Sequence, residues 1–198
     1  MSSALRTLGV IGPWERLHRA ESNTLASLLT ASEREAVHRR LGLPASPAQP
    51  AWVPASAGER GGRFAEPHGP GALYLGNDLA TCMQEVAHHH ALNCAASVGT
   101  PPGARAVFQH LRFQVSATLA DAAALRGGGL HDPSNYAPSW SFGRLARAAG
   151  LAGVHYRSVR RRGGRCLALF ENRAARFLRV EFGAVVLEWD GRGSRRVA

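Results

Sequence analysis

The chain has 198 residues, enough for one domain with its own hydrophobic core. Apolar residues make up 45% and charged residues 19%, which is an ordinary globular composition. A run of about 18 apolar residues that would cross a membrane is absent, and the N-terminus lacks the apolar core of a signal peptide. We therefore expect a cytoplasmic protein.

The formal net charge is +10, and all 24 basic residues are arginine. This charge suggests an anionic partner: nucleic acid, a phosphorylated small molecule or an acidic protein. Arginine binds phosphate bidentately better than lysine does. A GC-rich coding sequence also explains the absence of lysine, so charge alone does not decide the function.

The N-terminal third contains two expected elements and a linker. Residues 15–20 are consistent with a short strand that carries Arg19. A capping-box pattern predicts a helix over Ser32–Leu41. Residues 43–58 are rich in proline and small side chains and are expected to form a linker, which Trp52 pins to the body of the protein.

The next segment is expected to be a loop, a strand and a helix. Residues 59–71 form a Gly/Pro loop, residues 72–76 a short apolar strand, and a helix capped by Asn77 or Asp78 runs to about Leu92. The spacing on this helix predicts a buried stripe of Leu79, Cys82, Met83, Val86 and His90. Because Glu85 lies at the edge of the stripe, its carboxylate can face a cleft while the helix stays anchored.

The remaining sequence predicts further short strands and helices. Strand 105–115 is expected to point Val107, Leu111, Phe113 and Val115 inward. It is followed by a short helix over 119–126, a helix over 138–149 stopped by Gly150 at C′, strands over 153–156 and 166–170, and a hairpin of 176–182 and 184–190 around Gly183. Short strands mixed with helices without regular alternation predict an α+β fold.

Common motifs for nucleotides and metals are absent. The sequence contains neither a P-loop nor a G-x-G-x-x-G fingerprint after a strand. Three successive residues on a helix point in different directions, so His88–His90 are not expected to converge on one metal ion. Cys82, Cys94 and Cys166 are an odd number without CxxC spacing, which favours buried reduced thiols.

Taken together, the short motifs resemble a known family. The order GGRF, LYLG, MQEVAHHH, VHYRSVR and CLALF resembles the RES-domain family, which is named for its arginine, glutamate and serine. The matching residues are Arg63, Glu85 and Ser158. Tyr74 lies eleven residues after Arg63 and eleven before Glu85, which allows the three to meet at one end of a strand–helix pair. LHRA resembles the family's N-terminal arginine strand and points to Arg19.

The resemblance covers roughly residues 15–25 and 59–170, with two departures. Phe64-Ala65 stands where the family usually has Trp-Asn, and Arg157 stands where a proline usually precedes the serine. We expect a single domain with three parts: an N-terminal segment (1–58), a RES-type catalytic core (59–170) and a C-terminal hairpin extension (171–198).

The resemblance implies an ADP-ribosyltransferase-like fold of mixed sheets flanked by helices, and a toxin that consumes NAD by breaking its nicotinamide–ribose bond. NAD is then a substrate, and the family implies neither a metal nor a bound cofactor. Carboxylates stabilise the oxocarbenium-like state of such cleavages. The implied roles are catalysis for Glu85, Arg63 and Ser158, phosphate binding for Arg19, Arg63 and Arg160, and aromatic contact with NAD for Phe64 and Tyr74.

Other interpretations stay open. The same site would serve protein ADP-ribosylation, and the basic surface would suit an acidic antitoxin protein. A homodimer is a further alternative. A basic module that binds nucleic acid is the rival class, suggested by the RSVRRRGGR run. Aromatic residues are only 7% and are not interleaved with that run, so direct contact with nucleic acid is not expected.

Overall fold

The computed structural model describes residues 5–19 and 52–198. The predicted helix Ser32–Leu41 and linker residues 43–51 lie outside these ranges. The described elements are β1 (Thr7–Arg19), β2 (Leu73–Gly76), α3 (Leu79–Ala96), β3 (Arg105–Asp121), α4 (Ala137–Ala148), β4 (Gly153–Arg157), β5 (Arg165–Leu169), β6 (Ala175–Trp189) and β7 (Ser194–Arg196), with short 3-10 helices at Ala122–Ala124 and Asn172–Ala174. The expected α+β class is confirmed.

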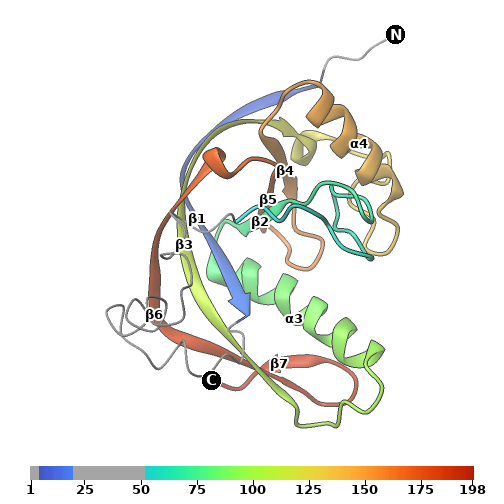
Figure 1. Ribbon diagram of the computed structural model, residues 1–198, viewed down its shortest axis with the longest axis vertical. Coiled ribbons are helices and arrows are strands. Elements are labelled where there is room, and N and C mark those ends of the chain that lie inside the picture. The colour runs from blue at the N-terminus through green and yellow to red at the C-terminus, as the bar shows by residue number, and fades with distance from the viewer. Residues whose placement is uncertain (1–4, 20–51) are drawn as a thin grey trace, which may run out of the picture.

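The strands form one mixed sheet in the order β1-β2-β5-β4-β3-β6-β7. Since β1 also pairs with β3, the first five strands of this order form a closed ring, and β6 and β7 continue outward from it. Most neighbours are antiparallel, whereas β3 and β4 are parallel over Ala120–Asp121. The strands β1, β3 and β6 run side by side as a curved wall, and α3 lies on its concave side (Figure 1).

Three strands are much longer than the sequence predicts. β1 has 13 residues, β3 has 17 and β6 has 15. The helix expected over 119–126 is wrong, because β3 continues through Asp121 and only Ala122–Ala124 form a 3-10 turn. The extended conformation is more stable than a helix there, because β3 pairs with β1 on one side and with β4 on the other.

The hairpin expected around Gly183 is also wrong. β6 stays paired with β3 on both sides of this glycine, at Gln109↔Ala184 and Leu111↔Val180. Gly183 has a φ of +91° and lies in the irregular stretch of β6 that faces the register shift. The chain reverses instead between β6 and β7, where Asp190 Oδ1 accepts hydrogen bonds from the backbone of residues 192 and 193.

The same register shift changes which side chains of β3 face inward. Val107 was expected inward, but its side chain is 43% exposed, while Ala106 and Phe108 are buried. Leu111 and Phe113 are buried as predicted. A bulge moves every side chain on one side of it to the opposite face, which an uninterrupted alternation does not capture.

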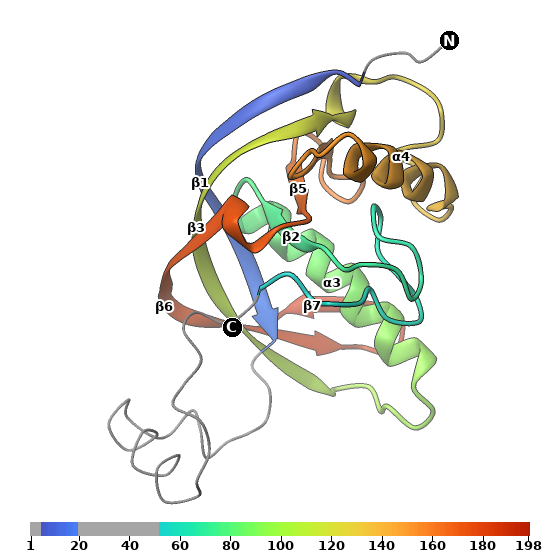
Figure 2. The ribbon, with the colours of Figure 1, turned by 45° about the horizontal axis from the view of Figure 1, so that its top comes forward.

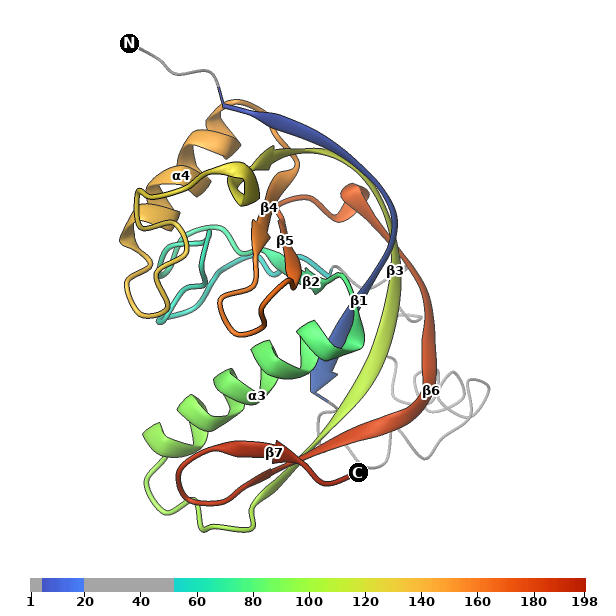
Figure 3. The same ribbon diagram turned by 180° about the vertical axis from the view of Figure 1, so that it is seen from behind.

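Two helices cover different parts of the sheet (Figures 2 and 3). α3 is capped by Asp78, whose side chain accepts a hydrogen bond from the Thr81 N–H at 2.7 Å, and it ends at Ala96, later than predicted. α4 packs against β4 and is followed by Gly150 at a φ of +70°, as expected for a C′ glycine. No helix in the described ranges is long and apolar enough to span a membrane.

The core lies between the strands of the ring and the wall. Leu73, Leu167 and Leu169 are fully buried together with Phe113. Trp52 packs edge-on against Phe113, with ring centroids 5.1 Å apart. This contact confirms that Trp52 attaches the end of the linker to the body of the protein.

Candidate active site

A cavity of about 300 Å³ opens between α3, β1, β2 and the loop that carries Arg63. Its size lies at the lower end of the range of small-molecule sites. It is lined by Arg16, Leu17, Gly61, Gly62, Arg63, Tyr74, Leu75, Gly76, Cys82, Glu85, Val86, His89, Tyr136, Tyr156 and Cys166. Three residues expected at the site, Arg63, Tyr74 and Glu85, are therefore brought together in its wall.

Glu85 and Ser158 are joined directly. The Ser158 hydroxyl donates to Glu85 Oε1 at 2.6 Å. Ser158 Oγ itself accepts hydrogen bonds from the backbone N–H groups of Arg160 and Arg161 at 3.2 and 3.0 Å. Two donors aimed at the serine oxygen leave its own hydrogen for the carboxylate. Ser158 lines a second hollow together with His131 and Arg157, and it is not among the residues that line the first cavity.

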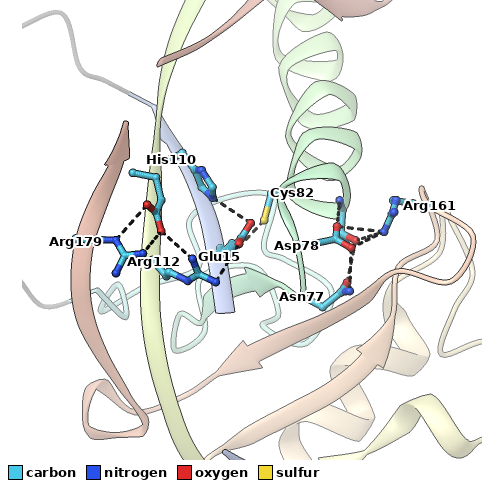
Figure 4. A network of polar contacts seen from close by, with 10 residues as sticks. Glu15, Asn77, Asp78, Cys82, His110, Arg112, Arg161 and Arg179 are labelled. Atoms are coloured by element: carbon cyan, nitrogen blue, oxygen red, sulfur yellow. Dashed lines mark hydrogen bonds and ion pairs between the residues drawn. The ribbon is translucent and has the colours of Figure 1, made fainter. Parts of the chain in front are cut away.

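The loop that carries Ser158 is fastened to the start of α3. Arg161 Nη1 lies 2.8 Å from Asp78 Oδ2 and donates to Thr81 Oγ1 at 3.0 Å (Figure 4). Although loss of water acts to raise the pKa of Asp78, hydrogen bonds from Thr81 and the charge of Arg161 lower it. This close approach requires glycine at position 164, because a Cβ there would lie 2.9 Å from Thr81 Oγ1.

Arg63 is buried and held in one orientation. Its Nη1 donates to the carbonyl oxygens of Leu130 and Asp132 at 3.1 and 2.8 Å, and its guanidinium lies 4.5 Å from the centroid of the Tyr136 ring. Its exposed fraction is 6%. Within the described chain its other N–H groups make no hydrogen bond, which leaves them for a ligand in the cavity.

Arg16, which the sequence did not single out, lines the cavity in place of Arg19. Its Nε is buried and has no hydrogen-bond partner among the described residues. Burial lowers the pKa of its guanidinium. Arg19 is exposed at the end of β1, outside the cavity wall. Both arginines lie on β1, three residues apart, so their side chains point to opposite faces of the strand. The sequence does not show which of these faces meets α3.

The neighbours of Arg16 are fixed by contacts between elements. The Cys82 thiol donates to the Glu15 carbonyl oxygen at 3.2 Å and ties α3 to β1. The Glu15 carboxylate lies 3.0 Å from His110 Nε2 and 4.0 Å from the Arg112 guanidinium (Figure 4). These contacts hold the strand segment that presents Arg16 to the cavity.

Tyr74 presents a buried phenol to the cavity. A Cβ at Gly62 would lie 2.3 Å from its oxygen, so only glycine fits opposite it. Its hydroxyl has no hydrogen-bond partner of good geometry in the described part of the chain. Burial raises the pKa of Tyr74 to about 12, so the hydroxyl is protonated and can donate. Buried polar atoms that lack a partner are typical of sites that await a ligand.

Two other expected site residues do not line this cavity. Phe64 is 1% exposed and packs in the core, with its ring centroid 4.9 Å from that of Tyr156. Arg160 donates through Nη2 to the Pro133 carbonyl at 2.7 Å. Loss of water is the largest cause that lowers the pKa of His88 and His89, and the charge of Arg160 lowers it further.

The face of α3 that meets the cavity carries residues beyond Glu85. Cys82, Val86 and His89 follow helical spacing and line the wall with it. Burial raises the pKa of Cys82 to about 12 and raises that of Cys166, so both thiols are neutral and free of disulfides. His89 follows Glu85 by four residues, so the sequence alone places both on the same face of the helix.

The charges in the wall suit one kind of chemistry. Two arginines line the cavity, the buried Arg63 and the half-buried Arg16, and guanidinium groups bind phosphate well. One carboxylate, that of Glu85, faces the same space and can stabilise positive charge that develops on a bound molecule. Within the described residues, no group of acidic, histidine and cysteine side chains is arranged to hold a metal ion.

Comparison with known proteins identifies the fold and the family. The chain is similar to a chain in the crystal structure of the M. tuberculosis MbcT–MbcA toxin–antitoxin complex, with a TM-score of 0.56 and 14% sequence identity. The similarity covers 88% of this chain and 85% of that one, and shows a shared fold. No curated protein matches the sequence. The RES domain profile matches residues 36–190, well over half of the chain. The protein is therefore a member of the RES domain family.

Proposed function

We propose that this protein is an enzyme that consumes NAD by breaking the bond between nicotinamide and ribose. One observation carries the proposal: a single cavity combines the hydrogen-bonded carboxylate of Glu85 with two guanidinium groups, those of the buried Arg63 and the half-buried Arg16. NAD has the matching features, a pyrophosphate and a sugar that becomes cationic as the bond breaks. Membership of the RES domain family supports the same substrate.

Each wall residue has a role in this reaction. Arg16 and Arg63 bind the pyrophosphate, and Tyr74 and Tyr136 offer aromatic faces and a hydroxyl to the nicotinamide end. Glu85 opposes the oxocarbenium-like sugar, and Ser158 fixes the orientation of the carboxylate through its 2.6 Å hydrogen bond. The electron pair of the broken bond goes to the nicotinamide nitrogen, which neutralises the positive ring, so the leaving group needs no proton.

The acceptor of the ADP-ribosyl group separates the alternatives. Water gives ADP-ribose, phosphate gives ADP-ribose-1-phosphate, and a protein side chain gives a modified protein. We place water first, because the cavity is open to solvent at His89. Incubation of the purified protein with NAD, with and without phosphate, followed by mass spectrometry, distinguishes the three.

Substitution of Glu85 tests the proposal directly. Glu85→Gln keeps the shape of the side chain and its hydrogen bond with Ser158 but removes the negative charge. We expect nicotinamide release to fall by at least about 100-fold, in line with the loss of an electrostatic catalytic group. Circular dichroism and Tm of the variant should match the parent protein. Near-normal turnover by a folded Glu85→Gln protein would exclude Glu85 from the mechanism.

We further propose that the enzyme is the toxin of a toxin–antitoxin pair. The similar structure described above is that of a toxin–antitoxin complex. The net charge of +10 would favour an acidic partner. Expression of the chain alone should arrest growth, with loss of cellular NAD, and the Glu85→Gln variant should not. Growth arrest that persists with this variant would point to a different toxic activity.

A further inference from the structure

The three consecutive histidines of α3 have three different environments. His90 Nδ1 lies 2.7 Å from the Ser194 hydroxyl, and its Nε2 lies 3.6 Å from the Cys94 thiol, so it joins α3 to β7. His88 lies outside the cavity wall. His89 lies in the wall, one helical turn after Glu85. Only the middle histidine is therefore placed to meet a bound molecule.

Hydrolysis of NAD needs a proton acceptor that Glu85 is poorly suited to provide. Its carboxylate must keep its negative charge opposite the sugar cation, and Oε1 already accepts the Ser158 hydrogen bond at 2.6 Å. An attacking water loses a proton as its oxygen bonds to the sugar carbon. A second group at the open side of the cavity is needed to take that proton.

His89 has the surroundings that this task requires. The charged groups that act on it come from three elements: Glu85 on its own helix, Arg63 on the loop across the cavity and Arg160 on the loop after β4. Loss of water and the two arginines lower the pKa of His89, and Glu85 acts in the opposite direction. The imidazole is therefore neutral at pH 7. His89 lines the cavity wall and is also partly exposed to solvent, so water can reach it although its surroundings in the protein remove part of its hydration.

We propose that His89 is the general base of NAD hydrolysis, an inference that rests on the proposed function. The water oxygen forms a bond to the anomeric carbon of the ribose, while the bond from that carbon to nicotinamide breaks and its electron pair stays on the ring nitrogen. A proton of the water passes to the free ring nitrogen of His89 and from there to solvent. The products are nicotinamide, ADP-ribose and one proton.

The neighbouring histidine provides a matched control. His89→Gln and His88→Gln remove the same group from adjacent positions of one helix. Nicotinamide release is measured in phosphate-free buffer across a range of pH. In the parent protein we expect kcat to fall on the acid side, below the ordinary histidine pKa of 6.5. His89→Gln should lower kcat at pH 7.5 by about 100-fold and abolish this acid limb. His88→Gln should keep both.

Two further measurements separate chemistry from structure. The Kd for NAD and the Tm of His89→Gln should match those of the parent, and His89→Asn replaces it if the first variant does not fold. Exogenous imidazole should restore turnover to His89→Ala, because the open mouth admits it. An unchanged acid limb in a folded His89 variant overturns the proposal, as does a weaker Kd with unchanged kcat. Absence of nicotinamide release by the parent protein instead overturns the proposed function itself.

Discussion

Arg16 is a half-buried cation that lines the cavity, and its buried Nε makes no hydrogen bond within the described chain. Removing a charged group from water costs free energy unless a partner compensates for it. For Nε the described residues provide no such partner, so we expect Arg16 to lower the stability of the ligand-free protein. The lowered pKa of its guanidinium expresses the same cost.

Replacement of Arg16 should therefore separate stability from binding. Arg16→Met keeps the bulk of the side chain but removes the charge. We expect the free energy of unfolding of the ligand-free protein to stay the same or to increase by on the order of 1 kcal/mol. Its Tm should accordingly stay the same or rise. The Kd for NAD should rise by roughly 10- to 100-fold, because a hydrogen bond to a charged group contributes about 1.5–3 kcal/mol. Calorimetry and thermal denaturation measure the two quantities.

The exposed arginine of the same strand is the control. Arg19→Met should change neither Tm nor the Kd for NAD by more than a small amount, because Arg19 lies outside the cavity wall. If Arg19→Met weakens NAD binding and Arg16→Met does not, the phosphate site lies at the end of β1. That result would restore the assignment that the sequence alone favours.

At the scale of elements, the loop after β4 and the helix α3 act as one unit. Ser158 contacts Glu85 on α3, and Arg161 contacts Asp78 and Thr81 at the beginning of the same helix. The serine is thus held from two sides, by its own loop and by the helix. Its hydrogen bond to Glu85 depends on both elements keeping their positions.

Loss of the Arg161 contacts should lower turnover more than stability. The ion pair is half-exposed, so Arg161→Ala should cost at most about 1 kcal/mol of unfolding free energy. Without it the Ser158 loop has more freedom, and we expect kcat to fall roughly tenfold, or about 1.4 kcal/mol, with little change in KM. Arg162 is exposed and has no contact with α3 among the described interactions, so Arg162→Ala is the control. Equal kcat values for the two variants would contradict a positioning role for Arg161.

Element boundaries show what local sequence can and cannot predict here. The helical phase that placed Glu85 beside the buried stripe of α3 is a local property, and the cavity confirms it. The prediction of a hairpin around Gly183 was wrong, because a glycine within a strand pattern indicates either a turn or a bulge. Only the pairing of β6 with β3 on both sides of Gly183 distinguishes the two.

Across the whole molecule, four histidines share one direction of pKa shift. Loss of water is the largest cause that lowers the pKa of His88, His89, His90 and His131 below 6.5. Between the lowered values and 6.5, the unfolded chain binds protons at these positions that the folded protein does not. Stability is therefore full above pH 6.5 and decreases as the pH falls through the folded-state pKa values.

Thermal denaturation checks this expectation. Tm should be lower at pH 5.5 than at pH 7.5, and His131→Gln should reduce the difference, because the unfolded variant has one proton fewer to gain. A Tm that rises on acidification would contradict the direction of these shifts. The half-exposed Asp78 loses its stabilising contacts only at more acidic pH, because its pKa lies below 3.8.

The sequence by itself determined the α+β class, a helix α3 capped at Asn77 or Asp78, its phase, and the proximity of Arg63, Tyr74 and Glu85, which line one cavity. These features depend on spacing along one element or on short motifs around the chemistry. The tertiary structure decided which arginine of β1 faces the cavity, that Phe64 belongs to the core, and that His89 joins the wall. It did so because each depends on which face of a strand or helix meets a distant part of the chain, and the closed pairing of β1 with β2 and β3 fixes that choice.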